Sequence, residues 1–304
     1  MRKCAFLTMD SLEAFVCDDE LAYTPLRDRG WTVESVSWRD RPVDWDTYDL
    51  VVIRSTWDYQ NAPEEFLSVL EEIEDSKARL ENPLEVVRWN LSKRYLHELE
   101  TRGVRIPTTV WLDRLESGEL EQLYSELSTD ELVLKPLVGA NADLAFRLDR
   151  RSAMDRASEV EAVYSDRPLL AQPFLRNVLH EGEYSLFYFS GRHSHTILKT
   201  PREGDFRVQE EHGGFIQAVA AEPALIAAGD RAMSAIPWEL LYARVDLVRD
   251  DEGEFRLMEL ELIEPALYFR MDPASPKRFA DTIVRLLGLP GSEVQRIRGS
   301  AVKP

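Results

Sequence analysis

Three carboxylates toward the C-terminus could together hold a divalent metal ion. Extended strands are expected over 242–249 and 255–263, joined by a DDEG turn, with Asp246 on the first strand and Glu259 and Glu261 on the second. Alternate residues of a strand share a face, and here that face comprises Leu257, Glu259, Glu261 and Ile263. Buried carboxylates need a partner, and clustered oxygens suit Mg²⁺ bound together with phosphates. The alternative is a solvated hairpin face on which acids need no ligand.

Two lysines occupy positions where a phosphate would explain them. Lys135 ends an apolar strand over 131–135 and precedes a small-residue turn over 138–142, whose backbone N–H groups could help to hold phosphates. Lys93 falls in the first turn of a helix expected over 91–102 with Asn90 as its N-cap, where the helix dipole disfavours a cation unless an anion is bound. The alternative for the small-residue turn is a plain surface hairpin.

Two further segments have the composition of binding loops. A buried strand over 168–176 runs into the stretch 172–175 (QPFL), which is typical of a hinge and whose backbone could read the edge of an adenine. Two strands follow, opened by Glu183 and closed by Lys199. The loop over 204–214 (GDFRVQEEHGG) is too polar for a core, so we favour a phosphate- or substrate-binding loop.

The first 85 or so residues predict a parallel α/β layer. Strands expected over 3–9, 31–38 and 49–55 alternate with helices, and no GxGxxG motif marks a dinucleotide site. The third strand runs into RSTWDY, and loops at the carboxyl ends of parallel strands bind ligands. The candidate substrate residues of this loop are Arg54, Ser55, Thr56 and Asp58. Arg54 could bind a carboxylate with both guanidinium edges, or it could simply pair with Asp58 in a polar turn.

Composition excludes several classes of function. The 304 residues carry a formal net charge of −18, which repels nucleic acid and anionic membranes. No apolar run approaches the length of a membrane span, and the N-terminus is unlike a signal peptide, so we expect a cytoplasmic protein. Cys4 and Cys17 lack metal-ligand spacing and are expected to be reduced thiols.

Taken in order, these elements resemble the ATP-grasp superfamily. The loop GDFRVQEEHGG resembles that of RimK-type and glutathione synthetase-like members, and RVD followed by ELE resembles their metal-binding positions. RSTWDY, VVRWNLSKRYL and LELIEP are similar to the branch containing the cycloserine-forming cyclo-ligase, which closes O-ureido-serine with ATP. The resemblance extends from about residue 3 to residue 290.

The resemblance implies an α/β ATP-grasp fold in three parts. These would be a parallel pre-ATP-grasp domain over 1–88, a small ATP-grasp subdomain or lid over 89–172, and a large subdomain with the metal site over 173–290, followed by a polar tail over 291–304. Asp246, Glu259 and Glu261 fall on the family's metal positions, with Glu261 where an Asn is usual. The extra charge could tighten Mg²⁺ or Mn²⁺ binding or raise the pKa of one carboxyl group.

The resemblance also assigns roles to the other candidates. Lys93 and Lys135 would hold the ATP phosphates, and Glu183 would contact the ribose. Arg207 and Lys199 would be catalytic, and Gln209 would lie on the substrate side. The remaining nucleotide-binding residues would be Gly139, Asn141, Gln172, Pro173, Phe174 and Leu175.

The implied reaction is a carboxylate–amine ligation through an acyl phosphate, with release of ADP and phosphate. A small amino-acid-like substrate is expected, but the residues leave open whether the amine comes from a second molecule or from the same one. A nucleotide-binding protein without turnover is a further alternative, although both lysines and all three acids are present. Relatives commonly form dimers or tetramers, which leaves a homo-oligomer open.

Overall fold

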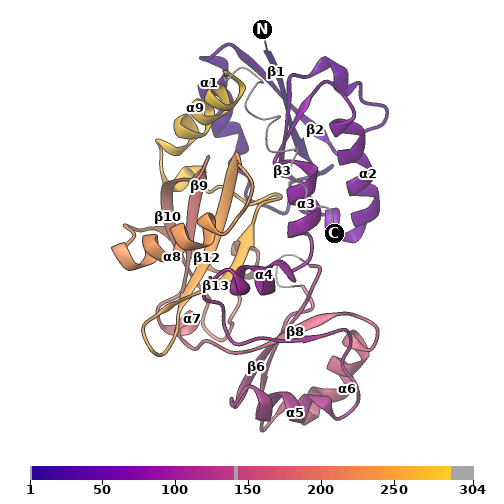
Figure 1. The fold of residues 1–304 in the computed structure, drawn as a ribbon, viewed down its shortest axis with the longest axis vertical. Helices are drawn as coiled ribbons and strands as arrows, with labels where there is room; N and C mark the ends of the chain where they lie inside the picture. Colours follow the sequence, from indigo (N-terminus) through magenta and orange to yellow (C-terminus); the bar gives the residue numbers. More distant parts are fainter. Residues whose placement is uncertain (1, 140–142, 289–304) are drawn as a thin grey trace.

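The chain forms three β-sheets that succeed one another along the sequence (Figure 1). The computed structural model describes residues 2–139 and 143–288, so the expected ligand Asn141 and the expected tail over 291–304 lie outside the described residues. The first sheet is parallel and the other two are antiparallel, which confirms the α/β fold with an N-terminal parallel layer.

The parallel sheet has the strand order β2-β1-β3-β4. Its strands are β1 (Arg2–Thr8), β2 (Trp31–Ser37), β3 (Leu50–Ser55) and β4 (Arg79–Glu81). Every residue of β3 is buried, as expected for a parallel strand covered on both faces. Helices α2 (Pro63–Glu74) and α3 (Leu84–Asn90) pack on one face, while η1 (Asp19–Ala22), α1 (Tyr23–Arg27) and the C-terminal helix α9 (Ser275–Gly288) pack on the other.

Helix α9 ties the end of the chain to its beginning. Figure 1 shows α9 beside α1, and the rings of Phe6 and Phe279 lie 6.3 Å apart between centroids. The same apolar cluster includes Phe187 and Phe189, so the first and last sheets share a core. The sequence assigned α9 to the large subdomain, whereas its packing also makes it part of the N-terminal layer.

The second sheet is a separate antiparallel layer with the order β5-β8-β6-β7. Its strands are β5 (Val110–Leu112), β6 (Glu131–Pro136), β7 (Phe146–Asp149) and β8 (Leu169–Pro173). Helices α5 (Glu119–Glu126) and α6 (Ala153–Tyr164) cover one face, where Leu123, Tyr124 and Val160 join the buried side chains of the strands. The opposite face is left to line a cavity described below.

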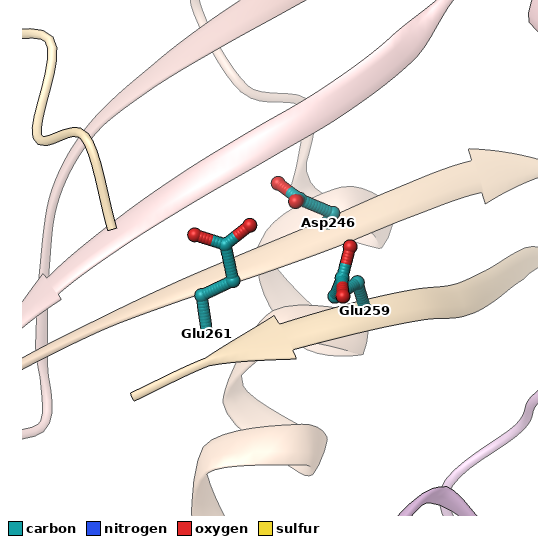
Figure 2. Close-up of side chains that lie close together, drawn as sticks. All are labelled: Asp246, Glu259 and Glu261. Atoms are coloured by element: carbon teal, nitrogen blue, oxygen red, sulfur yellow. The ribbon is translucent and has the colours of Figure 1, made fainter. Parts of the chain in front are cut away.

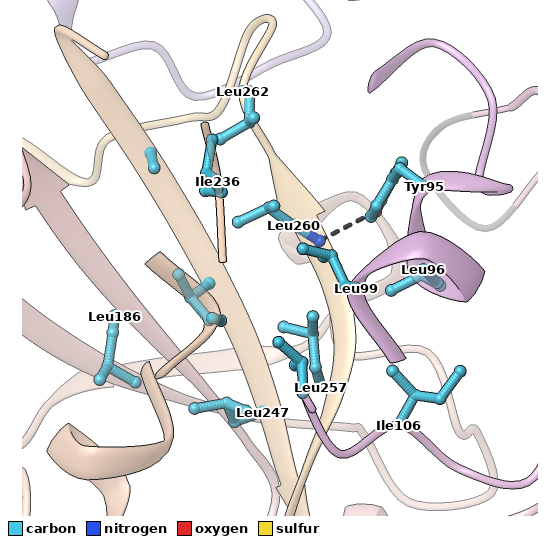
Figure 3. Close-up of a cluster of buried hydrophobic side chains, with 14 of the residues drawn as sticks. Tyr95, Leu96, Leu99, Ile106, Leu186, Ile236, Leu247, Leu257, Leu260 and Leu262 are labelled. Atoms are coloured by element: carbon cyan, nitrogen blue, oxygen red, sulfur yellow. Dashed lines mark hydrogen bonds between the residues drawn. The ribbon is translucent and has the colours of Figure 1, made fainter. Parts of the chain in front are cut away.

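The third sheet carries the acidic cluster and has the order β11-β10-β9-β12-β13. Its strands are β9 (Glu183–Phe189), β10 (Arg192–Thr200), β11 (Phe215–Ala218), β12 (Tyr242–Arg249) and β13 (Phe255–Glu261). Helices α4 (Tyr95–Thr101) and α8 (Pro223–Ser234) pack on one face through a cluster that includes Leu99, Leu186, Leu225 and Leu257 (Figure 3). The Tyr95 hydroxyl accepts a hydrogen bond from the Leu260 N–H at 2.9 Å.

Buried polar contacts hold the third sheet against the first. The Asn82 amide donates to the carbonyl groups of Leu262 and Tyr242 at 2.7 and 3.0 Å and accepts from the Leu241 N–H. The Tyr242 hydroxyl hydrogen-bonds to the carbonyl oxygens of Ile53 and Ile263, at 2.6 and 2.8 Å. Each bond satisfies backbone that would otherwise be buried without a partner, so the segment after β13 is fixed against the parallel sheet.

Several predicted elements differ from the structure. The helix expected over 91–102 is wrong at its start, because α3 ends at Asn90, α4 begins at Tyr95, and Lys93 lies in the turn between them. Asn90 caps no helix. Its side chain instead bonds the backbone of Leu260 and Leu262 at 2.9 Å, so a tertiary contact outweighs the local capping preference.

Other elements differ as well. Strand β11 (Phe215–Ala218) was not predicted, strand β5 is limited to Val110–Leu112, and helix α8 ends at Ser234. A register shift between Asp246 and Leu247 pairs Glu259 with Asp246 but Leu257 with Leu247. This bulge turns Leu257 into the apolar core, so the simple alternation predicted for that residue is wrong while Glu259 and Glu261 still face the site.

No helix within 2–139 and 143–288 is both long and apolar enough to cross a bilayer. Cys4 and Cys17 are both free, as predicted.

His195 makes the stability of the apolar core shared by the first and third sheets depend on pH. Its ring stacks on Phe187 with centroids 4.3 Å apart, donates through Nε2 to the Leu267 carbonyl at 3.0 Å, and has its pKa lowered to about 4 by burial. An unfolded histidine binds a proton near pH 6.5, so lowering the pH from 7 to 5 should reduce the free energy of unfolding by roughly 2 kcal/mol through this residue. Urea unfolding of His195→Phe at both pH values should show a fall smaller by that amount, and an equal fall would exclude this role.

Candidate active site

Three carboxylates converge at the open face of the third sheet. Asp246 on β12 and Glu259 and Glu261 on β13 each place an oxygen within 4.8 Å of the others' (Figure 2). The strand register explains the convergence, because Asp246 lies directly opposite Glu259 and Glu261 follows two residues later. The sequence predicted this cluster, and its donor set of carboxylate oxygens could hold a divalent metal ion.

Arg244 binds two of these carboxylates and was missed by sequence reasoning. Its guanidinium donates to Asp246 at 2.9 Å and to Glu261. Burial opposes ionisation of Asp246, but Arg244 and Lys199 outweigh it and hold its pKa below the usual value. Burial raises the pKa of Glu261 to about 7, with Arg244 opposing the rise and Glu259 and Asp246 adding to it. The signal for Arg244 was its position two residues before Asp246, on the same strand face.

Ser185 and Lys199 complete the surroundings of Asp246. The Ser185 hydroxyl donates to Asp246 at 2.5 Å, and the Lys199 ammonium lies 3.5 Å from the same oxygen. Lys199 also forms a buried ion pair with Glu183 at 2.6 Å. Burial raises the pKa of Glu183, and this lysine opposes the rise. Glu183 was expected to contact a ribose, and here it both lines the cavity described next and holds Lys199.

The two predicted phosphate lysines lie beside the carboxylates. Lys93 donates to the Gly139 carbonyl at 2.9 Å and pairs with Glu259 at 2.7 Å. Burial lowers the pKa of Lys135, partly opposed by Glu259, and its ammonium has no ion-pair partner among the residues that the structure describes. An unpaired, desolvated cation at the end of a strand is suited to an anionic ligand.

A cavity between the second and third sheets brings most of the predicted residues together. The predicted residues that line it are Lys93, Lys135, Gly139, Gln172, Pro173, Phe174, Leu175, Glu183, Lys199, Arg207, Gln209, Asp246 and Glu259. Sequence reasoning missed its apolar lining, which includes Val133, Val178, Phe206, Val208 and Met258. The Gln172 side chain donates to Thr109 at 3.0 Å. The cavity therefore has an apolar end near 172–175 and a charged end at the carboxylates, which suits a nucleotide with its base in the first and its phosphates in the second.

The loop over 204–214 closes one side of this cavity. Arg207 forms an ion pair with Asp205 at 2.8 Å, and hydrogen bonds from Arg207 hold the pKa of Asp205 well below its usual range. Gly214 lies against the loop's own backbone, where an added Cβ would stand 2.1 Å from the Val208 carbonyl oxygen. Only glycine therefore permits the chain to fold back and place Arg207 and Gln209 at the cavity.

Replacing Gly214 should displace the loop. We expect Gly214→Ala to lower kcat/KM about 100-fold, the scale of misplacing catalytic groups by about 1 Å. The control is Gly191→Ala in the β9–β10 turn, where φ is +71° and an added Cβ meets nothing within 4 Å. Gly214 lies outside the positive-φ region, so its replacement introduces the clash alone. Gly191→Ala introduces backbone strain without a clash and away from the cavity, so steady-state kinetics should show near-normal turnover. Equal losses of kcat/KM in the two variants would show that the loss in Gly214→Ala does not come from displacement of the loop over 204–214.

A second cavity adjoins the first at the carboxylates. Residues common to both cavities are Lys93, Gly139, Lys199, Gln209, Arg244 and Glu259. The other walls come from the loops after β1 and β3, from residues of α3 and α4, from the loop over 204–214, and from the end of β13 with the segment after it. They include Phe15, Trp57, Tyr59, Tyr95, Glu210, Glu261, Glu264 and Tyr268. The Trp57 indole donates to the Glu264 carbonyl oxygen at 2.9 Å, which fixes these two segments against each other.

The polar residues of RSTWDY lie away from both cavities. Arg54 is fully buried and donates to Asp19 at 2.9 Å and to the Pro265 carbonyl at 3.0 Å, so the alternative of a pairing with Asp58 is wrong. Ser55 donates to Thr8, and Thr56 is buried. Asp58 accepts from Trp38 and Arg39. The aromatic residues of the loop line the second cavity instead, so a direct substrate contact by the four predicted polar residues would require these bonds to open.

A cavity between two antiparallel sheets, lined by lysines and by an acidic cluster, is the arrangement of an ATP-grasp ligase. The D-cycloserine synthetase DcsG N-terminal domain family matches residues 4–82. The chain is 32% identical over 272 residues to the cycloserine biosynthesis protein DcsG of Streptomyces lavendulae, covering 85% of this chain and 90% of that protein. The chain belongs to the DcsG family and is an ATP-dependent ligase.

Solved structures agree with this assignment. The crystal structure of D-cycloserine synthetase DcsG matches with a TM-score of 0.81 and 29% identity, covering 94% of this chain and 99% of that one. A D-alanine–D-alanine ligase from Bacillus anthracis matches with a TM-score of 0.67 and 14% identity, covering 94% and 96% of the two chains. That second likeness is one of fold alone.

Proposed function

We propose that this enzyme is a cyclo-ligase that uses ATP to close a small amino acid of the O-ureido-serine type into a ring. The observation that carries the proposal is the shared boundary of the two cavities. A carboxylate bound there would contact Arg244 and Lys199 and would face the phosphate end of the nucleotide cavity. The similarity to DcsG supports cyclisation over joining two molecules.

The reaction proceeds in two steps whose charges these residues can stabilise. A carboxylate oxygen of the substrate attacks the γ-phosphorus of ATP, the bond to the bridging oxygen breaks, and ADP leaves. The substrate's own nitrogen then attacks the carbonyl carbon of the acyl phosphate, forms the C–N bond, loses its proton and expels phosphate. Lys93, Lys135 and Arg207 neutralise the negative charge of the phosphoryl group during its transfer. Arg244 stabilises the oxyanion that develops at the carbonyl oxygen of the acyl phosphate.

The acidic cluster fits Mg²⁺ or Mn²⁺. Three carboxylates place oxygens within 4.8 Å of one another, and such a cluster of hard oxygen donors suits a divalent cation, which would share these acids with Arg244 and Lys93. Asp246, Glu259 and Glu261 would hold the ion, and the ion would offset the negative charge of the ATP phosphates. Glu261 supplies the oxygen that an Asn supplies in other ATP-grasp enzymes.

The test uses the full chain with ATP, Mg²⁺ and each enantiomer of O-ureido-serine. ADP release should rise with one enantiomer. Mass spectrometry should detect a ring compound lighter than the substrate by one water, or cycloserine itself, matched to an authentic standard, once water has also removed the carbamoyl group as carbon dioxide and ammonia. A product with the combined mass of two substrate molecules less water would instead establish intermolecular ligation. ATP binding without ADP release in the presence of either enantiomer would refute the proposed substrate.

A further inference from the structure

The second cavity has an unbalanced distribution of charge. Its cationic residues all lie at the boundary with the nucleotide cavity, where Lys93 pairs with Glu259, Lys199 pairs with Glu183 and Arg244 pairs with Glu261. The part that the nucleotide cavity does not share has acidic and aromatic side chains but no lysine or arginine among the described residues. A ligand in the second cavity therefore meets cations at the boundary with the nucleotide cavity and acids in the part that the two cavities do not share.

Glu264 is a buried acid in the part of the second cavity that the nucleotide cavity does not share. It is 8% exposed, it lies three residues after β13, and no cation pairs with its carboxyl group in the part of the chain that the structure describes. Glu210, another acid of the same wall, pairs with Arg270. Burial raises the pKa of Glu264 well above its usual value, and Glu261 and Glu259 add to the rise. A buried carboxyl group without a counter-ion is costly, and a cationic ligand would remove that cost.

Aromatic rings surround the same region. Phe15 and Trp57 lie 5.2 Å apart between ring centroids, and Tyr59 and Tyr268 line the same cavity. Ammonium groups are stabilised by ring faces as well as by carboxylates, so acid and aromatic residues together favour an ammonium ion over a neutral or anionic group. Neither feature is explained by binding ATP, because Glu264 and these rings do not line the nucleotide cavity.

We propose that Glu264 binds the α-ammonium group of the substrate and restricts the enzyme to free amino acids. This inference rests on the proposed function and adds to it the orientation of the substrate. The carboxylate lies at the shared boundary, next to Arg244, and the ammonium group lies between Glu264 and the aromatic rings. Carboxylic acids that lack the amino group, and amino acids whose amino group is acylated, are excluded.

The test compares binding of paired ligands in the presence of ADP and Mg²⁺, so that no turnover occurs. The probes are both enantiomers of O-ureido-serine and of serine, each with the analogue that lacks the α-amino group, titrated by calorimetry. Wild type should bind the preferred amino acid about 100-fold more tightly than its analogue, the scale of a charged hydrogen bond in a buried site. Glu264→Gln should reduce that preference to less than about fivefold, mainly by weakening binding of the amino acid.

Two comparisons separate this role from others. Glu211→Gln changes an exposed acid at the mouth of the same cavity, and an equal loss of preference there would assign recognition to the general negative field rather than to Glu264. Glu264→Gln should bind ADP as tightly as wild type, and it should need the same Mg²⁺ concentration for that binding. A higher Mg²⁺ concentration needed for ADP binding, together with an unchanged preference for amino acids, would make Glu264 a metal ligand and overturn the proposal.

Failure of this inference is distinguishable from failure of the proposed function. A ring product formed by an enzyme that binds the des-amino analogue equally well refutes only the role of Glu264. A retained preference for amino acids without any ring product refutes only the proposed reaction. If no amino acid of the panel binds to wild type, the cavity is not an amino-acid site and the inference is refuted.

Discussion

Glu259→Gln is expected to lower kcat about 1,000-fold while leaving the fold intact. Glu259 supplies one of the three clustered carboxylates and pairs with Lys93 at 2.7 Å, so the substitution weakens the metal site and releases a phosphate-binding lysine together. Single groups that stabilise charge in a transition state are worth about 10²–10³ in rate, and this residue serves two such groups. The measurement is ADP release at saturating ATP and substrate, repeated over a range of Mg²⁺ concentrations.

Glu254→Gln is the matched control, because Glu254 lies just before the same strand but is exposed and pairs with Arg105. It should retain near-normal turnover. Thermal unfolding of Glu259→Gln should remain cooperative, because glutamine keeps the size of the side chain, although Lys93 loses the ion pair that lowers the pKa of Glu259. Turnover within tenfold of wild type, with an unchanged Mg²⁺ requirement, would remove Glu259 from the site.

The nucleotide side of the site was predictable because its signals are local. A lysine at the end of an apolar strand, two acids spaced by one residue on a strand, and a polar loop rich in glycine each conflict with ordinary burial rules. Such conflicts are visible within a few residues of sequence. The structure places Lys135, Glu259 and Arg207 around one cavity, although no sequence pattern required those three elements to meet.

The substrate side was not predictable because it depends on contacts between distant segments. Arg54 reads as a substrate-binding arginine by its position after a strand, yet it is neutralised by Asp19, 35 residues earlier, and by the carbonyl of Pro265. Trp57 of the same loop was assigned no site role from the sequence, yet its indole donates to the carbonyl oxygen of Glu264 and its side chain lines the second cavity. Packing between the parallel sheet and the segment after β13 decides which side chains of each loop face the cavity, and spacing along the chain carries no information about that packing.

The prediction of secondary structure was wrong where tertiary hydrogen bonds or packing replace local interactions. Asn90 has the residue type of a helix cap, but its amide satisfies the backbone of β13 and so ends one helix without starting the next. The bulge in β13 reverses the facing of Leu257 while preserving that of the acids. Both departures place functional groups, since the first leaves Lys93 in a turn facing Glu259 and the second directs Met258 into the nucleotide cavity.

Lys135→Met should change stability and function in opposite directions. The Lys135 ammonium is desolvated, which lowers its pKa, and within the described residues no acid pairs with it. Methionine keeps most of the volume and removes the charge, so the ligand-free protein should gain on the order of 1 kcal/mol, the scale of one uncompensated buried polar group. The same change removes a cation from the phosphates, so ATP affinity should fall about 100-fold and kcat still further.

Opposite signs make this substitution a sharp test of the site. A lysine that served only the fold would lose stability and activity together when replaced. Urea unfolding without nucleotide, calorimetric ATP binding and ADP release measure the three quantities separately, and Lys77→Met, whose side chain is 78% exposed, controls for the loss of a positive charge elsewhere. A less stable Lys135→Met protein that binds ATP normally would mean that Lys135 supports the second sheet and leaves the phosphates to Lys93.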